Sequence, residues 1–297
     1  MKKWMVYSIT WLVVIALVAG AYYAFAIHSQ PEQETEEAVR DGSKVQVDYI
    51  GMLAPEYGGG LVFDTSMYNV AVDNRSYPKT PTFQMRSEDR YTPLMVHVGE
   101  PSDSGYIQVI DGFSEGLMGM HPGESKVITI PPEKGYGYGD PALIENHSMT
   151  ENTRVREEYP EQRFIYEFGT SPKVGMVVEN PTYHWPMRVE NVFDGYAVLI
   201  NEPEVGKYYF NGAWNITVTD IDGSADNGNG TITVKNLLTP GDAYHIKGSG
   251  MTAYGEQKTF VLTGVDIRSD TYTIDYNDLT KGRTLIFTVR LISIDVY

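Results

Sequence analysis

Apolar and polar positions alternate along several short segments of the chain, and this alternation predicts strands. Residues 45–53 (VQVDYIGML) and 94–99 (LMVHVG) have the pattern of half-buried strands. Residues 127–130 (VITI) predict a buried strand of β-branched side chains, which two prolines then end. Residues 114–118 predict about two turns of helix before glycine and proline stop them. The pattern therefore indicates a mainly β fold, of the α+β kind, with a short helix.

The beginning of the chain differs from the rest because it is an uncharged apolar run. Residues 4–27 follow two lysines and are long enough to cross a bilayer, which takes about 20 residues. We expect residues 1–28 to form a transmembrane anchor, with the lysines in the cytoplasm and the remaining chain outside. The alternative is a signal peptide cleaved after residues 24–26 (AFA), which would give a secreted protein. Residues 29–43 are polar and acidic, as in a flexible linker.

The most specific pattern lies between Val109 and Asp140. It reads V-I-D-G-F-S-E-G-L-M-G-M, then G-E, an apolar strand and P-P-E-K-G-Y-G. This run resembles the core of FKBP-type peptidyl-prolyl isomerases, whose fixed positions occur here in order and at the family's spacing. The family's Y-x-G-x-L and F-D-x-S pieces are also present, at 49–53 and 63–66. The resemblance implies an antiparallel half-barrel wrapped on a short helix, formed by residues 44–140 and completed by 283–297.

The same resemblance implies a site that rotates the X-Pro amide without cofactor or metal. It implies catalytic roles for Tyr49, Phe63, Asp64, Ile110 and Tyr136, and substrate binding by Leu94, Val109, Phe113 and Phe287. Phe113 would be the floor, where many family members have Trp, and Leu94 replaces a usual Phe. The Ile110 N–H and the Tyr136 hydroxyl would hold substrate carbonyls, while Asp64 would orient Tyr49.

One expected partner of Asp64 cannot be placed by the resemblance. Many family members pair this aspartate with an arginine, and no arginine stands at the matching position. Arg75, Arg86 and Arg90 all lie in a long polar excursion over residues 67–93, and each is a candidate.

Residues 141–282 do not continue the compact pattern. Their first part resembles the insert-in-flap domain of SlyD-like members, a small β domain that binds unfolded chains in that family. The motif Asn–x4–Gly–basic occurs twice, at Asn201-Gly206-Lys207 and Asn277-Gly282-Arg283. Two repeated modules of about 75 residues would explain this spacing, and chance agreement of short motifs is the alternative.

Two segments could close the sheet of the FKBP-like domain. Residues 284–294 follow the family's joining sequence at the right distance, so we expect them to be the closing strand. Closure by residues 214–221 is the alternative, and it would make the remaining chain a separate C-terminal domain.

The composition excludes several classes of partner and of chemical site. The net charge of −16 argues against nucleic acid, which recruits proteins through basic residues. The absence of cysteine excludes disulfides, thiol catalysis and cysteine metal sites, and scattered histidines give no reason to expect a metal.

The resulting hypothesis is a membrane-anchored peptidyl-prolyl isomerase with chaperone activity on extracytoplasmic proteins. Its partners would be unfolded or proline-containing polypeptides. The alternatives are a catalytically weak holdase that captures unfolded chains, and a structural surface protein.

Overall fold

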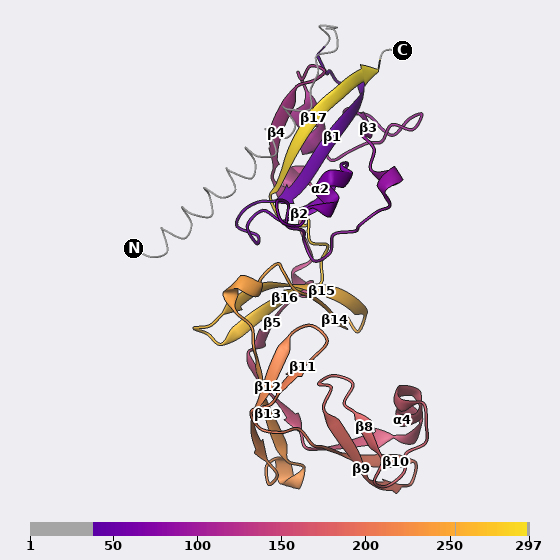
Figure 1. Ribbon diagram of the computed structural model, residues 1–297, viewed down its shortest axis with the longest axis vertical. Helices are drawn as coiled ribbons and strands as arrows, with labels where there is room; N and C mark the ends of the chain where they lie inside the picture. The colour runs from indigo at the N-terminus through magenta and orange to yellow at the C-terminus, as the bar shows by residue number, and fades with distance from the viewer. Residues whose placement is uncertain (1–37, 253, 296–297) are drawn as a thin grey trace. The chain divides into compact units, whose positions relative to one another are not determined.

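The computed structural model describes residues 38–252 and 254–295, which fall into two compact units (Figure 1). We call residues 38–144 with 275–295 the N/C unit, and residues 145–274 the insert. The expected anchor and most of the linker lie outside the described residues. Within the described ranges, no helix is long and apolar enough to cross a membrane. The fold is mainly β, as predicted, with few and short helices.

The N/C unit is built on one five-stranded antiparallel sheet. Its strands are β1 (Lys44–Leu53), β2 (Val62–Thr65), β3 (Leu94–His97), β4 (Ser125–Ile130) and β17 (Leu285–Asp295). Their order is β2-β1-β17-β4, and β3 also pairs with β1. The last strand therefore lies between strands from the first half of the chain, as Figure 1 shows for β1 and β17. The closing strand is thus the segment predicted at 284–294, whereas the alternative segment belongs to the insert.

Helix α3 (Asp111–Leu117) lies directly against strand β4. A Cβ atom at Gly112 would be 2.5 Å from Ile130 Cγ2, and one at Gly116 would be 2.4 Å from Ile128 Cδ1. Glycine weakens a helix by about 1 kcal/mol relative to alanine, yet at these two positions any side chain would push helix and strand apart. Phe113 on this helix is thereby held in the core, at 2% exposure.

Strand β4 is buried on one face only, which corrects the predicted fully buried strand. Ile128 and Ile130 are buried, whereas Val127, directly before Ile128, is 40% exposed. An antiparallel sheet can leave one face to solvent, and a run of β-branched residues does not reveal which positions face outward.

The excursion over residues 67–93 carries helix α2 (Tyr68–Val72) and a 3-10 turn, η1 (Glu88–Arg90). Val70 packs into a cluster with Ile50, Met52 and Val62, so the excursion is attached to the sheet at its start. The excursion is therefore more than the surface loop that its polar composition predicts.

The insert contains three four-stranded sheets. A first run of strands crosses the insert: β5 (Ile144–Ser148), β6 (Thr150–Arg154) and β7 (Arg156–Pro160). After helix α4 (Glu161–Phe168), three meanders follow in order: β8 (Val177–Glu179), β9 (Pro186–Phe193) and β10 (Tyr196–Asn201); β11 (Tyr208–Phe210), β12 (Asn215–Asp222) and β13 (Thr231–Asn236); β14 (Lys247–Met251), β15 (Gln257–Asp266) and β16 (Thr271–Asp275). The sheets are completed in reverse order, because β7 joins the first meander, β6 the second and β5 the third.

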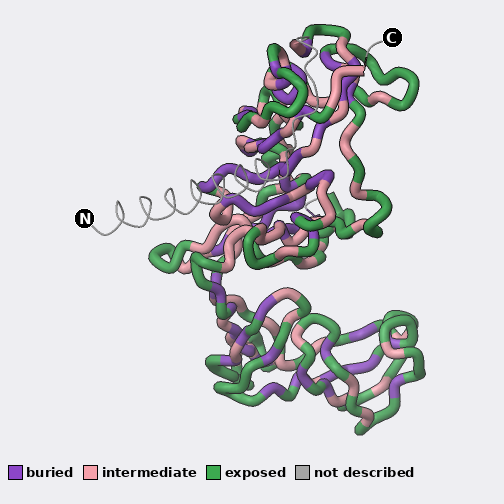
Figure 2. Tube along the Cα trace, turned by 45° about the horizontal axis from the view of Figure 1, so that its top comes forward, coloured by how far each residue is buried: buried purple, intermediate pink, exposed green. Residues whose placement is uncertain are grey.

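Three sheets replace the two modules that the motif spacing predicted. The middle meander lacks the basic residue of the motif. Its Asn236 and Gly241 keep the Asn–x4–Gly spacing, but the acidic Asp242 follows them. Each sheet has its own buried side chains, for example Val189, Val218 and Leu262, and Figure 2 shows buried positions recurring along the strands. The repeat unit is therefore one meander plus one strand of the first run.

An asparagine at the end of each meander, or just after it, binds the backbone of the outgoing chain, which consists of the first run and the residues directly before it. The three Nδ2 atoms donate to carbonyl oxygens as follows: Asn201 to Arg154 at 3.0 Å, Asn236 to Met149 at 3.2 Å, and Asn277 to Asp140 at 3.0 Å. In the first two, a tryptophan (Trp185 or Trp214) donates its Nε1 to the Asn Oδ1 at 2.6 Å. The repeated spacing of the motif thus has a physical cause, since each Asn binds a carbonyl of the outgoing chain.

A buried ion pair stabilises the segment that leads from the insert back to the sheet of the N/C unit. Arg283 Nη2 lies 2.8 Å from Asp275 Oδ2, and both side chains are less than 9% exposed. The Arg283 Nη1 also donates to the carbonyls of Leu279 and Lys281, at 3.0 Å each. Next to this pair, Gly282 N donates to Gly137 O at 2.7 Å. The Arg283 contacts fix the returning segment, and the Gly282–Gly137 hydrogen bond joins it to the segment that leads out of the sheet.

Candidate functional site

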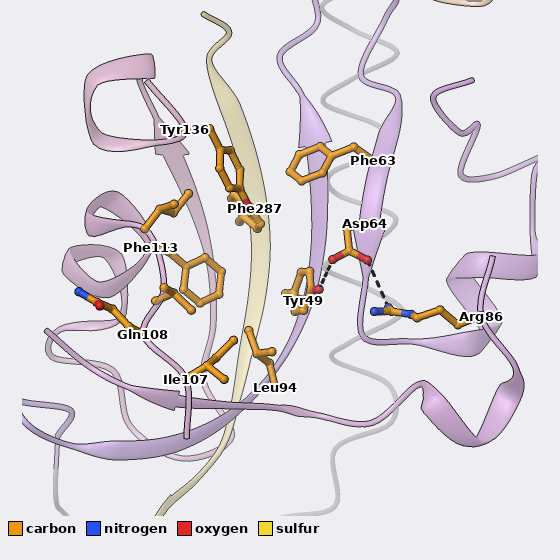
Figure 3. A pocket seen from close by; sticks show the side chains of 12 residues that line it. Tyr49, Phe63, Asp64, Arg86, Leu94, Ile107, Gln108, Phe113, Tyr136 and Phe287 are labelled. Atoms are coloured by element: carbon orange, nitrogen blue, oxygen red, sulfur yellow. Dashed lines mark hydrogen bonds and ion pairs between the residues drawn. The ribbon is translucent and has the colours of Figure 1, made fainter. Parts of the chain in front are cut away.

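A cavity of about 340 Å³ opens in the N/C unit, and the sequence-predicted site residues surround it (Figure 3). Its lining includes all nine of them: Tyr49, Phe63, Asp64, Leu94, Val109, Ile110, Phe113, Tyr136 and Phe287. They come from β1, β2, β3, β17, α3 and two loops, so only the closed sheet assembles them.

The floor of the cavity is a set of aromatic rings packed edge to face. Phe287 lies at its centre, 5.0 Å from Phe113 at an interplanar angle of 83° and 5.6 Å from Phe63 at 88°. Tyr49 packs against Phe113 at 6.2 Å and 85°. Gly51 allows this approach, because a Cβ there would lie 2.8 Å from the Phe63 ring and 2.9 Å from the Phe287 ring. Such a floor is apolar and rigid, which suits a flat, apolar ring as ligand.

One wall of the cavity is polar, and Asp64 organises it. The Tyr49 hydroxyl donates to Asp64 Oδ2 at 2.5 Å, while the backbone N–H of Thr65 donates to Oδ1 at 2.8 Å. Burial, followed by the negative charge of Asp64, raises the pKa of Tyr49 well above its ordinary value, so its hydroxyl keeps its proton.

Arg86 is the arginine that pairs with Asp64, at 3.2 Å between Nη2 and Oδ1. Its Nη2 also donates to the Thr65 carbonyl, and its guanidinium lies 4.7 Å from the centre of the Tyr91 ring. Of the three candidates in the excursion, the sequence could not single out Arg86, because its reach depends on the path of residues 67–93. The structure also adds Ile107 and Gln108 to the lining. Their only sequence signal is their place directly before the Val109-Ile110 motif.

Two hydrogen-bond donors at the cavity are unused. Within the described residues, neither the Tyr136 hydroxyl nor the Ile110 backbone N–H has an acceptor. The pKa of Tyr136 is raised, by burial first and then by the charges of Asp64 and Asp278, so the hydroxyl stays a donor. The cavity therefore combines an apolar floor with two free donors at its edge.

Comparison with known proteins places this site in a family. A family model for FKBP-type peptidyl-prolyl cis-trans isomerase matches residues 35–153. A short-type peptidyl-prolyl cis-trans isomerase of Methanocaldococcus jannaschii is 34% identical over 140 residues, which are 47% of this chain and 69% of that protein. The chain belongs to the FKBP-type peptidyl-prolyl cis-trans isomerases. FK506-binding protein 2 of Emericella nidulans is 31% identical over 133 residues, 44% of this chain and 75% of that protein.

Membership in the FKBP-type isomerases makes proline-containing polypeptides the substrates of this chain. The family match ends at residue 153, inside β6, and so does not include Phe287 on the closing strand. An essential part of the cavity therefore lies far outside the matched segment and returns to it only through the fold.

Proposed function

We propose that this FKBP-type isomerase holds the proline ring of its substrate on the aromatic floor and the neighbouring carbonyls at its two free donors. The Ile110 N–H and the Tyr136 hydroxyl are suited to bind those carbonyls. Asp64 fixes the Tyr49 hydroxyl, so that this wall does not reorganise during the reaction. The observation that carries the proposal is the pairing of an apolar floor with donors that no described residue uses.

Rotation about the amide requires no nucleophile. The barrier of about 18–20 kcal/mol comes from conjugation between nitrogen and carbonyl, which the twisted amide loses. A site lowers this barrier only if it binds the twisted form better than the planar forms. An apolar cavity favours the less polar, twisted amide. Donors that are fixed on the protein hold the neighbouring carbonyls in place while the amide rotates.

Catalysis is tested with a short X-Pro peptide and a protein whose refolding is limited by proline isomerisation. Tyr136→Phe removes one donor and should lower kcat/KM roughly tenfold, the value of one hydrogen bond of about 1–1.5 kcal/mol. Tyr138→Phe is the matched control, because Tyr138 lies in the same loop, is 71% exposed and does not line the cavity. Equal activity of Tyr136→Phe and wild type would remove Tyr136 from the proposed mechanism.

The proposed function also includes chaperone activity by the insert, which resembles the insert-in-flap domain of SlyD-like members. Support comes from strands β8, β11 and β14, each of which begins a meander and has a neighbour on one side only within the described residues. These strands carry exposed apolar side chains, among them Val177, Tyr208 and Met251. A cavity of about 330 Å³ lies beside β8. Strands with a free edge can accept an extended polypeptide as an additional strand.

The charge of the insert favours basic clients. Residues 145–274 hold 18 acidic and 10 basic side chains, a net charge of −8. An unfolded segment with apolar and basic residues would pair with an edge strand and would also be attracted by the negative charge of the insert.

Suppression of client aggregation tests the holdase component. A triple variant with Val177→Lys, Tyr208→Lys and Met251→Lys should lose most of the suppression while keeping peptide isomerisation. Tyr166→Lys is the control, since Tyr166 is 92% exposed but lies on α4 instead of an edge strand. If the triple variant protects clients as well as wild type, the edge strands are not the binding surface.

The proposed location is outside the cytoplasm, with residues 4–27 as a retained membrane anchor. The support is the apolar length of this run and the two lysines before it. Because the chain has no cysteine, a single Ser76→Cys variant can report location. A membrane-impermeant thiol reagent should label it in intact cells, and recovery of the protein in the medium instead would favour signal cleavage.

A further inference from the structure

A second cavity of about 250 Å³ adjoins the proline cavity in the N/C unit. The two cavities share Tyr49, Arg86, Leu94 and Ile107 as a common wall. A substrate proline on the aromatic floor would therefore have its neighbouring residues within reach of the second cavity.

Arg90 lies at this second cavity with no assigned interaction. Its side chain is exposed and forms no hydrogen bond or ion pair with any residue that the structure describes. Glu88 and Asp89 precede it in η1, but they do not line the cavity. Asp48, the nearest carboxylate on β1, accepts a hydrogen bond from Ser66 Oγ at 2.9 Å. A free guanidinium thus borders the cavity.

Arg86 in the common wall is a second cation at this cavity. Its Nη2 is occupied by Asp64 and Thr65, whereas its Nε is buried and has no acceptor among the described residues. That nitrogen is enclosed by the protein, so Arg86 contributes positive charge to the cavity wall and no donor that a ligand reaches through Nε. Thr92 also lines the cavity. Two arginines and a threonine, Arg86, Arg90 and Thr92, thus line the second cavity, and Arg90 is the exposed cation among them.

We propose that the second cavity is a substrate subsite for an acidic side chain close to the isomerised proline, with Arg90 as the residue that selects it. This inference rests on the proposed isomerase function and specifies its substrates. The chain as a whole carries a net charge of −16, so its overall field disfavours acidic peptides. A preference for an acidic residue must then come from nearby cations, and both arginines belong to the excursion over residues 67–93.

The test compares peptides that differ at one position. Glutamate, glutamine or lysine is placed in turn at each of the two positions before and after the proline, and kcat/KM is measured with the full chain. At one position we expect glutamate to exceed glutamine about two- to fivefold at low salt, the range of a partly exposed ion pair. The advantage should shrink as salt is added, because the pair is screened.

A charge reversal provides the decisive comparison. Arg90→Glu should abolish the preference for glutamate over glutamine and favour lysine at the same position. Arg75→Glu is the matched control, since Arg75 is an exposed arginine of the same excursion that lines neither cavity. Equal rates for the glutamate and glutamine peptides at every position would overturn the inference. The same reversal of preference by Arg75→Glu would also overturn it, because it would show only a long-range electrostatic effect.

Failure of the proposed function would look different. In that case no peptide is isomerised, yet fluorescence anisotropy of the labelled peptides still measures their Kd. If the glutamate peptide binds more tightly than the glutamine peptide, and Arg90→Glu removes this difference, the subsite is supported independently of catalysis. Equal Kd values for the two peptides would overturn it.

Discussion

The N/C unit and the insert are both antiparallel β structures, but they are assembled in opposite ways. In the N/C unit, β17 joins β1 to β4, so one sheet depends on segments more than 200 residues apart in sequence. In the insert, each meander completes a sheet with a single strand of the first run and has its own buried residues. The isomerase site requires the whole sheet of the N/C unit, because distant segments form it together. The insert is built from repeats, so one of its sheets can be altered without the others.

The same motif illustrates the difference. After Gly206, Lys207 forms an exposed ion pair with Glu204 at 2.8 Å. After Gly282, Arg283 is buried and pairs with Asp275. One repeated position thus serves as a surface residue in the insert and as a buried anchor in the N/C unit.

The largest expected effect comes from the same substitution in both units. Val289 on β17 and Val189 on β9 are both fully buried. Val289→Asp places a carboxylate in the shared sheet at a cost of several kcal/mol, comparable to the whole stability of a domain. We expect loss of the N/C fold and of all isomerase activity. Val189→Asp should unfold only the sheet of β7–β10 and leave peptide isomerisation unchanged.

Circular dichroism, thermal unfolding and a peptide assay measure both variants. If Val189→Asp abolishes peptide isomerisation as completely as Val289→Asp, the two units fold as one cooperative structure and the comparison fails.

The next effect concerns the repeated basic position. Arg283→Ala leaves Asp275 buried without its charged partner, which should lower the free energy of unfolding by about 3–5 kcal/mol. Lys207→Ala removes an exposed pair and should not change the thermal midpoint measurably. Denaturant unfolding followed by the signal of the N/C unit provides the measurement. Similar midpoints for Arg283→Ala and Lys207→Ala would show that the buried pair does not anchor the returning chain.

These differences also explain which features the sequence could predict. That nine residues meet at one cavity was predictable, because they occupy short motifs at family spacing. The partner of Asp64 was not, since Arg75, Arg86 and Arg90 all lie in the same polar excursion and only its path selects Arg86.

The insert was harder to predict than the N/C unit. Its meanders differ in loop length and in the residue after the glycine, so the middle repeat escaped the motif comparison. The reverse order in which β5, β6 and β7 join the sheets is a long-range property, and no local pattern encodes it. Likewise, the exposed position of Val127 depends on which face of β4 packs on α3.

A shortened insert sharpens the comparison further. Asn201 N donates to Val155 O at 2.8 Å, so these residues can be joined through two glycines after removal of 156–200. The variant loses the sheet of β7–β10 with its edge strand β8 and keeps the other two sheets. We expect unchanged isomerisation of a short peptide and several-fold weaker suppression of client aggregation, because fewer edges act together.

Its control is the intact chain with the same two glycines inserted between Asp194 and Gly195, at the turn between β9 and β10. Full protection of clients by the shortened chain would mean that the remaining two sheets carry all of the binding.

The smallest expected effect is the response of isomerisation to pH. The proposed mechanism uses hydroxyl donors on Tyr49 and Tyr136, and both have a pKa raised above the ordinary value of 10.0. In both, burial is the main cause, and the nearby charge of Asp64 adds to it. A raised pKa means that the folded protein holds the phenol proton more tightly, so both donors persist below about pH 10.

The peptide kcat/KM should therefore stay constant between pH 7 and about 9.5, and it should decline only when the phenols begin to ionise at higher pH. Tyr136→Phe should have the same flat profile at a lower level, because it removes a donor that does not titrate in this range. A clear inflection between pH 7 and 9 in the wild type would reveal an ionising group in the mechanism. An inflection that Tyr136→Phe abolishes would identify Tyr136 as that group, contrary to the shift that its burial imposes.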